Sequence, residues 1–551
     1  MIHIKHSRKT YLSIFLLLTV ISLTFSCKRH RKYKKEIHTD FTYDNFAKQL
    51  ETVVRPIDTL NKTFYRSIPH NMRYAYQHND YDPIWLSHGY KPDIAADKFL
   101  AELEEMRWDG FNPERYNLAA LKKLKDRLGK SETTLAEAIA FDTALTMSYL
   151  TAAGDLLFGT ITPKKADSLW YHVNDSSWKA ADGLTSMQEK YLSLNEFRSK
   201  VPTYELLREE YKHYTQLTAD GAFNRAISAL RDSDITGKER QETITAIINK
   251  EAPWATTTPN DTLDEWVQLL TAYQDYLAIK PTGKVDSATL KCLTTPPDSF
   301  LARIGANMER IRWMQRDFGN IYIIVDVPLM QLFFREGGKN AMHMNVVVGK
   351  PARQTPSLYA KMANVVINPP WGVPPTILKQ EVLPGLQKSG QAYLDKKGLK
   401  VYDQKGKPIN VSSINGKNYK RYNYKQAPGD DNALGYVKFN LPNPWDIYLH
   451  DTPHRLDFGK RDRALSSGCV RLQYPQEMAL FILGTLEKKN FTQEKLDSII
   501  QTHITQWNVL ANKIPVHVAY LTAFEDTTGH HIRYARDVYQ RDGKLIAMMG
   551  K

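Results

Sequence analysis

Cysteine is scarce in this chain: its 551 residues include only Cys27, Cys292 and Cys469. These three are far apart in the sequence, which excludes a disulfide framework and a clustered thiolate zinc site. The body of the sequence also lacks a dominant low-complexity tract or a long run of like charge, and 42% of its residues are hydrophobic. That composition excludes disordered and fibrous proteins, and the length implies two to four domains.

A single apolar segment near the start of the chain has the character of an export signal. Residues 11–25 read "YLSIFLLLTVISLTF" and follow a basic stretch over residues 5–9. Fifteen apolar residues are short for a bilayer span, so we expect a signal peptide. The segment "LTFSC" resembles a bacterial lipobox ending at Cys27, the residue that would be lipidated, although Thr24 stands where leucine is commonest. A cleaved signal and an uncleaved membrane anchor are the alternatives, and all three place the body outside the cytoplasm.

Positive charge exceeds negative charge, with a formal net charge of +14. Part of the excess lies in the basic tether "KRHRKYKKE" directly after Cys27. A basic chain could bind nucleic acid, but no nucleic-acid motif accompanies the charge and the export signal argues against that partner. An anionic polymer of the cell envelope fits better.

The first half of the sequence is helical in pattern. Residues 91–111, "KPDIAADKFLAELEEMRWDGF", have apolar residues at helical spacing before an Asp-Gly stop. Residues 134–159, "TLAEAIAFDTALTMSYLTAAGDLLFG", predict a second helix that ends at a glycine. We interpret residues 41–254 as a helical scaffold without a catalytic constellation, followed by a linker, "PWATTTP".

Residues 262–296 predict a small helical unit, with one amphipathic helix, a Pro-Thr-Gly turn and a second helix capped by Asp286 or Ser287. Cys292 lies on the apolar face of that second helix and is predicted to be a core residue. The segment resembles the peptidoglycan-binding domain of cell-wall enzymes at Tyr273, Gln274, Gly283, Val285, Thr289 and Leu293. A helical spacer that binds nothing is the alternative.

From Asn320 onward, apolar residues recur at every second position instead of at helical spacing, which indicates strands. The runs "IYIIVDVPLMQLFF" and "MHMNVVVG" flank Glu336-Gly337-Gly338, a hairpin signal, and "GYVKFNL", "WDIYLHD" and "PVHVAYLTAFED" follow. The stretch between them, residues 376–432, is long for a loop, so we expect a functional lid or cap. One helix is predicted at "YPQEMALFILGTLEKK", and this half of the chain is otherwise mainly β.

The candidate catalytic residues lie in two short segments, "DIYLHD" and "SSGCVRL". Strand alternation places Tyr448 and His450 together, opposite their apolar neighbours, and it places Cys469 and Arg471 together in the second segment. Gly468 permits a sharp turn beside the sulfur. A thiolate nucleophile with an imidazole base is thereby predicted.

Such a pair also needs an orienter for the histidine and donors for an oxyanion, and backbone N–H groups around Gly468 could supply the donors. The set favours acyl transfer through a thioester. A structural cysteine is the alternative that the residues alone leave open. His454 is a rival base, but it follows the strand end and is predicted to be a solvated loop histidine.

The segment "HDTP…SSGCVRL" resembles the catalytic signature of the L,D-transpeptidases, which have a YkuD-type β domain. Further similarity lies in "VVVGKPARQTP", "NPPWGVPPTI", "NALGYVKFNLPNPW", "PVHVAYLTAF", "YDPIW" and "DGFNPERY". Together these segments resemble the large, multi-domain form of gram-negative envelopes, over nearly the whole mature chain.

The resemblance implies a role for each matched residue. Cys469 would be the nucleophile, His450 the proton donor and acceptor, the Asp451 backbone carbonyl the orienter, and the Gly468 N–H an oxyanion donor. Substrate contacts would come from Tyr448, Arg471 and Ser467. Ser467 stands where smaller members have histidine, and a structural ion pair is the alternative for Arg471. Trp371 is a further pocket candidate for which a core position is the alternative.

The implied reaction is attack on the third stem residue, normally diaminopimelate, of a tetrapeptide donor, with release of D-alanine. The amine of another stem would then resolve the thioester and form a cross-link. Alternatives are a thioester hydrolase and a non-catalytic, lipid-anchored peptidoglycan-binding protein. No metal or organic cofactor is implied. The partners are peptidoglycan stem peptides and a membrane held through the N-terminal anchor, in the periplasm.

The predicted fold class is multi-domain α+β. The predicted order is a signal and lipobox over 1–27, a basic tether over 28–40, a helical scaffold over 41–254, a three-helix peptidoglycan-binding-like domain over 255–300, a connecting helix over 301–319, and a mainly-β catalytic domain over 320–551 that includes the capping insertion over 376–432.

Overall fold

A computed structural model describes residues 43–55, 68–87, 90–128, 133–172, 180–185, 191–231, 235–256 and 264–550. The predicted signal, lipobox and basic tether lie outside these residues, as does part of the predicted linker. The chain divides into two units: the first holds residues up to Gly159 together with 175–199, and the second holds 160–174 together with 200–551. Within the described residues, no helix combines the length and the apolar character that a bilayer crossing requires.

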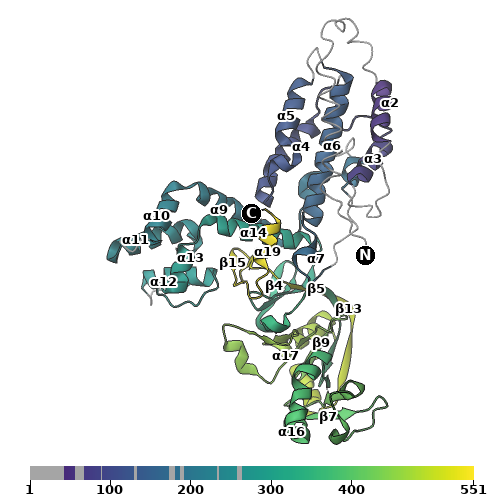
Figure 1. The fold of residues 1–551 in the computed structure, drawn as a ribbon, viewed down its shortest axis with the longest axis vertical. Coiled ribbons are helices and arrows are strands. Elements are labelled where there is room, and N and C mark those ends of the chain that lie inside the picture. The colour runs from purple at the N-terminus through teal and green to yellow at the C-terminus, as the bar shows by residue number, and fades with distance from the viewer. Residues whose placement is uncertain are drawn as a thin grey trace. The chain divides into compact units, whose positions relative to one another are not determined.

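The first unit is helical, and its helices pack around one apolar core (Figure 1). Thr134 and Glu137 form a capping box at the start of the longest of these helices, and Gly159 ends that helix with φ +70°. The elements are α2 (Tyr43–Val54), α3 (Ile68–His78), α4 (Ile94–Glu105), η2 (Met106–Asp109), η3 (Pro113–Tyr116), α5 (Leu118–Arg127), α6 (Leu135–Phe158), α8 (Asp182–Thr185) and η4 (Leu194–Phe197). The predicted helices over 91–111 and 134–159 are confirmed by α4 and α6.

The second unit begins with helices that share one core with part of its sheet. They are α7 (Pro163–Ala166), α9 (Pro202–Ala219), α10 (Gly221–Arg231), α11 (Gly237–Glu251), η5 (Pro253–Thr256), α12 (Glu265–Tyr276), α13 (Ser287–Leu293) and α14 (Pro297–Arg312). The helices α9 to α11 fall within the predicted scaffold range, yet they belong to the unit that holds the sheet.

Several of the residues that resemble a peptidoglycan-binding domain make contacts inside the protein that stabilise the local fold. The Gln274 side chain donates to the Lys284 carbonyl at 2.8 Å and to Thr289 Oγ1 at 2.8 Å, and it accepts from the Gly283 N–H at 2.9 Å. Gly283 has φ +63°, and a Cβ there would lie 2.6 Å from Val267. These contacts close the turn between α12 and α13, which begins with Asp286 as its N-cap. A separate three-helix domain is not confirmed.

The strands of the second unit form one large sheet in the order β1-β5-β13-β2-β3-β4-β12-β10-β9, and β9 also pairs with β5, so the sheet closes on itself. Its strands are β1 (Trp170–Tyr171), β2 (Ile321–Asp326), β3 (Gln331–Glu336), β4 (Lys339–Gly349), β5 (Ser357–Ile367), β9 (Val437–Asn440), β10 (Leu449–His450), β11 (Ala464–Ser466), β12 (Val470–Leu472) and β13 (Gln506–Ala519). The core inside this sheet is apolar. A mainly-β domain is therefore confirmed for this half of the chain.

The predicted hairpin at Gly337-Gly338 is confirmed, since β3 and β4 pair antiparallel across it. Both glycines have positive φ, +58° and +77°, as a two-residue turn that matches strand twist requires. The run over 321–334 is not one strand, however: the segment between Val327 and Met330 turns the chain and separates β2 from β3. Alternation alone did not predict this turn because its residues are as apolar as the strands.

The remaining elements are α17 (Pro475–Leu480), the π-helical η11 (Phe481–Leu486), α18 (Gln493–Gln501), the short helices η6 (Pro351–Arg353) and η10 (Arg455–Gly459), the hairpin β14 (Ala523–Glu525) and β15 (Ile532–Tyr534), and α19 (Asp542–Met548). Some of them pack on the sheet, whereas β14, β15 and α19 pack against the helices of this unit. Pro475 occupies the first turn of α17, so the predicted helix there is confirmed.

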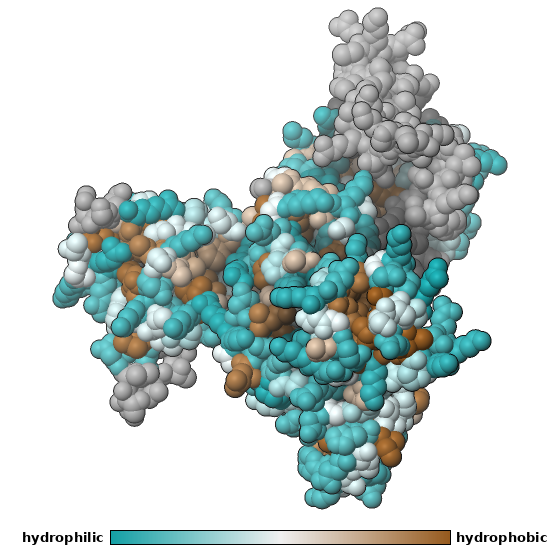
Figure 2. Space-filling model, turned by 60° about the horizontal axis from the view of Figure 1, so that its bottom comes forward, coloured by the Kyte–Doolittle hydropathy of each residue, from teal (hydrophilic) through white to brown (hydrophobic). Residues whose placement is uncertain are grey.

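The stretch predicted as a lid or cap has a fold of its own. A three-stranded sheet in the order β6-β8-β7 packs with helices around a small apolar core. In Figure 1 this cap lies around α16 and β7, and Figure 2 shows a mainly hydrophilic surface at that end of the second unit. Its elements are β6 (Trp371–Gly372), α15 (Pro375–Ile377), the π-helical η7 (Leu378–Val382), α16 (Leu383–Lys396), β7 (Leu399–Tyr402), η8 (Val411–Ser413), η9 (Tyr419–Arg421) and β8 (Asn423–Gln426).

Candidate active site

The strands β10 and β12 are parallel neighbours, and their register joins the two candidate segments. Leu449 pairs with Val470, and His450 pairs with Arg471. The Val470 N–H donates to the Tyr448 carbonyl at 3.2 Å, which brings Tyr448 beside Cys469. Paired residues of parallel strands share a face, and Leu449 and Val470 are fully buried in the core. The predicted facing is confirmed: Tyr448, His450, Cys469 and Arg471 lie on the other face, which we call the catalytic face.

The thiol of Cys469 is half-buried and has several polar neighbours. Its sulfur lies 3.6 Å from the Asp446 carbonyl, and it also receives hydrogen bonds from the backbone N–H and the hydroxyl of Tyr448. Burial raises the pKa of the thiol, while the Tyr448 hydrogen bonds and the charge of Lys438 lower it. These donors suit a thiolate because both Tyr448 groups direct hydrogen at the sulfur.

His450 is buried, with 5% of its surface exposed. Its Nδ1 lies 2.5 Å from the backbone carbonyl of Asp451, the contact that the sequence analysis predicted for the orienter. A carbonyl only accepts, so Nδ1 carries the hydrogen and Nε2 keeps a free lone pair. Burial, followed by the charge of Arg471, lowers the pKa of His450 to about 3. The imidazole is therefore neutral at ordinary pH and available as a base.

The segment that carries this carbonyl is itself held by the Asp451 side chain. Its carboxylate accepts from the N–H of Tyr436 at 2.9 Å and of Thr452 at 2.7 Å, and it pairs with Arg455 at 3.0 Å. Gly435 makes room for it, since a Cβ there would lie 2.4 Å from the carboxylate. The backbone position of Asp451 is thus strongly constrained.

Two cations flank the catalytic face. Lys438 pairs across the sheet with His450, and its ammonium lies 4.1 Å from the centre of the Tyr448 ring. Arg471 makes an ion pair with Asp457 at 3.3 Å, and its buried Nε has no hydrogen-bond partner among the described residues. The structural ion pair considered for Arg471 is therefore present. Lys438 was not predicted, although alternation in "GYVKFNL" places it opposite its apolar neighbours.

Gly468 forms the turn before the nucleophile with φ +119°, a conformation that favours glycine. Its N–H donates to Ser466 Oγ at 3.1 Å, and its carbonyl accepts from Thr355 Oγ1 at 2.8 Å. The predicted oxyanion donor is therefore already engaged in this structure. The Gly468 N–H would have to break its hydrogen bond to Ser466 Oγ before it could donate to a substrate oxyanion.

Ser467 points away from the interior and is exposed. It accepts a hydrogen bond from Arg353 Nη1 at 2.8 Å, and the same guanidinium donates to Gln380 and pairs with Glu381, both at 2.6 Å. Arg353 thus connects the nucleophile turn to η7 of the cap. Arg353 was not predicted, because its contact with Ser467 spans 114 residues and those with Gln380 and Glu381 span 27 and 28.

Trp371 lies in β6, where the cap meets the catalytic face. Its side chain hydrogen-bonds that of Tyr448, and its surface is partly exposed rather than buried in a core.

His454 is exposed, as predicted, in the loop before η10. The pKa of Cys292 is raised by burial to about 11, which suits an inert core thiol.

Comparisons with known proteins agree with this geometry. Residues 320–492 match the model of the YkuD family, described as an L,D-transpeptidase catalytic domain, and residues 70–210 match a Scaffold domain. A Haemophilus influenzae protein described as "Putative L,D-transpeptidase" is 27% identical over 459 residues, which is 79% of this chain and 89% of that protein.

Two solved structures are also similar in part. One is the carbamoyl enzyme of Ldtfm with avibactam, at 14% identity and a TM-score of 0.18. The other is a cysteine-to-serine mutant of the Enterococcus faecium L,D-transpeptidase, at 13% identity and a TM-score of 0.18. Both matches cover 40% of this chain, and the chain spans 63% and 64% of those two proteins.

The chain therefore carries a YkuD-type L,D-transpeptidase catalytic domain and a scaffold domain. The family resemblance predicted from the sequence is confirmed. It supports a transpeptidase role on peptidoglycan, and hence a location in the cell envelope.

Proposed function

We propose that this protein cross-links peptidoglycan stem peptides through a cysteinyl thioester on Cys469. The observation that carries the proposal is the shared face of Cys469 and His450, with His450 Nδ1 bound to the Asp451 carbonyl. A nucleophile, a neutral base and an orienter for that base are the minimum set for acyl transfer by a Cys-His enzyme.

The proposed first half-reaction forms the thioester. His450 Nε2 takes the proton of the Cys469 thiol, and the sulfur attacks the amide carbonyl between diaminopimelate and the terminal D-alanine. The oxyanion takes the Gly468 N–H in place of Ser466 Oγ. The carbon–nitrogen bond then breaks, and His450 gives its proton to the nitrogen of departing D-alanine.

The second half-reaction transfers the acyl group. The side-chain amine of diaminopimelate on another stem attacks the thioester, His450 takes the amine proton, and Cys469 leaves as the thiol when that proton returns to it. The Arg471 guanidinium, which pairs in register with His450, is suited to a substrate carboxylate. The cap favours an amine acceptor over water by covering the site.

Incubation of the soluble body with a disaccharide-tetrapeptide tests the proposal. Loss of D-alanine together with a dimer mass is the expected result, and Cys469→Ala should abolish both. Loss of D-alanine with added water and no dimer would instead assign a hydrolase. Full activity of Cys469→Ala would overturn the mechanism.

We also propose that residues 1–27 export the protein and that Cys27 is lipidated, so that the basic tether holds the body near a membrane surface. The α12–α13 region is proposed to contact peptidoglycan. Intact mass of the membrane-extracted protein tests lipidation: a diacylglyceryl mass on a chain beginning at Cys27 supports it, and an unmodified terminus refutes it.

A further inference from the structure

The cap contains a cavity of about 400 Å³ whose lining comes from the cap alone. One part of the lining is Gly372, Val373, Pro375 and Leu378, and the rest comes from residues 419–425 of η9, β8 and the link between them. Three tyrosines, one asparagine and two lysines contribute, and none of the lining residues is acidic. The tyrosines are Tyr419, Tyr422 and Tyr424.

Tyr424 carries a polar group without a partner. Only 3% of the residue is exposed, and its hydroxyl is buried without a hydrogen bond to any described residue. Burial raises the pKa of Tyr424 to about 12, so the hydroxyl keeps its proton and is a donor. A buried hydroxyl that lacks a partner is costly, and this one lies in the apolar core of the cap.

The lysines on the cavity rim are Lys420 and Lys425, and both are exposed. Lys420 Nζ lies 5.9 Å from the centre of the Tyr419 ring. The whole insertion is basic, with eleven Lys and Arg residues against five Asp and Glu residues over 376–432. An apolar aromatic floor below two ammonium groups fits a ligand with a carboxylate and an aliphatic body.

The cavity adjoins the catalytic face through one strand. Gly372 lines the cavity, and the preceding Trp371 hydrogen-bonds the Tyr448 hydroxyl, which in turn contacts the Cys469 sulfur. The residue before Gly372 thus connects the cavity lining to the side chain that contacts the nucleophile.

We propose that this cavity binds a free carboxylate of a stem peptide, with the carboxylate at Lys420 and Lys425. The inference rests on the proposed function for the identity of the peptide. The cavity would then select stems whose carboxylates are free over stems in which they are amidated.

Binding to the Cys469→Ala protein, which cannot turn over, tests the proposal. Calorimetric titration should show the free-acid tetrapeptide binding about ten-fold more tightly than its carboxamide. Lys420→Glu with Lys425→Glu should abolish that preference. The control is Lys405→Glu with Lys407→Glu, which makes the same change in charge at exposed cap positions outside the cavity lining. This control protein should keep the preference for the free acid.

Equal affinity for the two peptides, or a preference that survives the double Lys420 and Lys425 change, would overturn the proposal. The two proposals fail separately. If the Cys469→Ala protein binds with the preference but the wild type forms no dimer, only the proposed reaction is wrong. If the wild type forms dimers, but the Lys420 and Lys425 changes leave the peptide affinities of the Cys469→Ala protein unchanged, only the cavity site is wrong.

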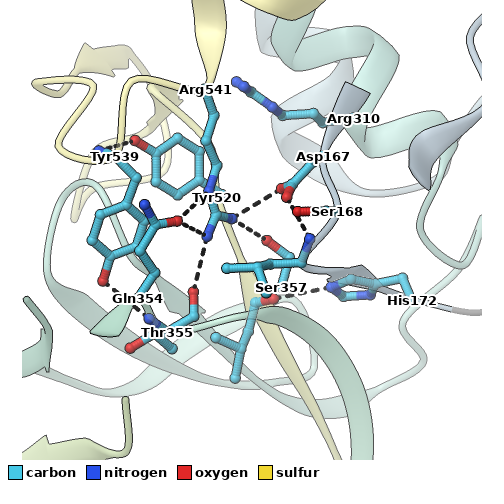
Figure 3. Close-up of polar contacts among 12 residues, drawn as sticks. Asp167, Ser168, His172, Arg310, Gln354, Thr355, Ser357, Tyr520, Tyr539 and Arg541 are labelled. Carbon is cyan, nitrogen blue, oxygen red and sulfur yellow. Dashed lines mark hydrogen bonds and ion pairs between the residues drawn. The ribbon is translucent and has the colours of Figure 1, made fainter. Parts of the chain in front are cut away.

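A different set of contacts, shown in Figure 3, supports the nucleophile turn from inside the second unit. Arg541, of which 8% is exposed, donates to Gln354 Oε1 at 2.7 Å and pairs with Asp167 at 2.9 Å. It also donates to the Thr355 carbonyl at 3.4 Å. The guanidinium thus holds the backbone and a side chain of the segment between η6 and β5.

Tyr539 and Thr355 continue this network toward Gly468. The Tyr539 hydroxyl donates to the Gly349 carbonyl at 2.5 Å and accepts from the Thr355 N–H at 3.2 Å. Thr355 Oγ1 accepts from the Gly349 N–H at 2.8 Å and donates to the Gly468 carbonyl at 2.8 Å. Thr355 is fully buried, and both functions of its hydroxyl are used.

The Gly468 carbonyl belongs to the peptide group that also carries the Cys469 N–H. Holding that carbonyl fixes the plane of the peptide and the direction in which Cys469 leaves the turn. Small displacements of a reacting group are costly, with about 10²-fold lost for 1 Å. We infer that Thr355 and Arg541 are positioning residues for Cys469, acting through Gly468 without touching the sulfur.

Thr355→Val tests this inference because it keeps the shape and removes the hydroxyl. We expect kcat to fall about 10- to 100-fold with KM within two-fold, and the pH profile of Cys469 alkylation by iodoacetamide to shift. Thr355→Ser should restore both. Unchanged alkylation and kcat in Thr355→Val would refute the inference, and the alkylation readout does not depend on the proposed reaction.

Arg541→Lys provides a second variant, since lysine keeps the charge beside Asp167 and loses the forked contacts with Gln354 and Thr355. A fall in kcat with KM unchanged is expected. The matched control is Arg536→Lys, at an exposed arginine of the same C-terminal segment that pairs with Asp462. Equal effects of the two lysine variants would argue against positioning by Arg541.

Discussion

The first unit and the catalytic face both bury polar side chains, and they use them differently. In the first unit, the buried carboxylate of Asp142 accepts from the Tyr76 hydroxyl at 2.6 Å and from the N–H groups of Ile84 at 3.0 Å and Trp85 at 2.8 Å. Every such bond joins one part of the fold to another. All three bonds are therefore internal to the fold.

The catalytic face keeps open valences instead. His450 uses Nδ1 for the Asp451 carbonyl and leaves Nε2 free, and Arg471 Nε has no hydrogen-bond partner among the described residues. An unsatisfied buried group costs stability, and such groups concentrate at functional sites. A free donor or acceptor marks a functional residue only beside the nucleophile, since Trp170 and His517 also bury ring nitrogens without a partner among the described residues.

The largest expected effect is on the base. His450→Ala should lower kcat/KM about 10²- to 10⁴-fold because it removes the imidazole that is proposed to take the thiol proton. The thermal midpoint should change far less than this activity. Turnover of the disaccharide-tetrapeptide, with circular dichroism as the folding control, measures both. Retention of wild-type turnover would remove His450 from the mechanism.

A substitution in the Asp142 network should lower stability and leave turnover nearly unchanged. Asp142→Ala strands three donors inside the first unit and should lower its free energy of unfolding by about 3 kcal/mol. Denaturant titration measures this loss, and kcat per folded molecule should stay within two-fold. A loss of kcat without a loss of stability would contradict the structural role assigned here.

Lys438→Met tests the electrostatic part of the catalytic face. The ammonium lowers the pKa of Cys469, so its removal should raise that pKa further. The rate of Cys469 alkylation at neutral pH should fall about five- to ten-fold, and the profile should move to higher pH. Lys438→Arg, which keeps the charge, should behave like the wild type.

The pH dependence of stability should reflect the buried histidines. In the folded state burial lowers the pKa of His450 to about 3 and that of His172 to about 4. Between about pH 6.5 and these values the unfolded chain binds protons that the folded chain does not, so stability falls as the pH falls. Each such histidine contributes at most about 1.4 kcal/mol per pH unit. His450→Gln should reduce the slope relative to the wild type, as denaturant titrations at several pH values would show.

The smallest effect is expected at the rival histidine. His454 is exposed and caps a short helix outside the catalytic face. His454→Ala should change kcat/KM by less than about two-fold. A loss comparable to that of His450→Ala would mean that the wrong histidine is assigned as the base.

Local sequence pattern predicted a large part of this protein. Alternation in two short segments predicted which face each of Tyr448, His450, Cys469 and Arg471 occupies, since side chains of a strand point to opposite faces in turn. The Gly337-Gly338 hairpin and the long helix α6 were predicted for similarly local reasons. The Asp451 carbonyl as orienter came from the family resemblance and not from local pattern.

Long-range contacts escaped prediction. Arg353, Thr355 and Arg541 are unremarkable in the sequence, yet they reach the nucleophile turn or its support from far along the chain. The sequence also did not predict that residues 160–174 and the helices α9 to α11 belong to the unit that holds the sheet.

The sequence by itself determined the chemistry of the candidate site and the face on which each residue lies, because side-chain type and strand periodicity are local properties. Tertiary structure alone decided which groups surround Cys469 and which donors remain free. A hydrogen bond or an ion pair between distant segments depends on how the sheet closes and on where the cap folds, and neither is encoded in any short stretch of residues.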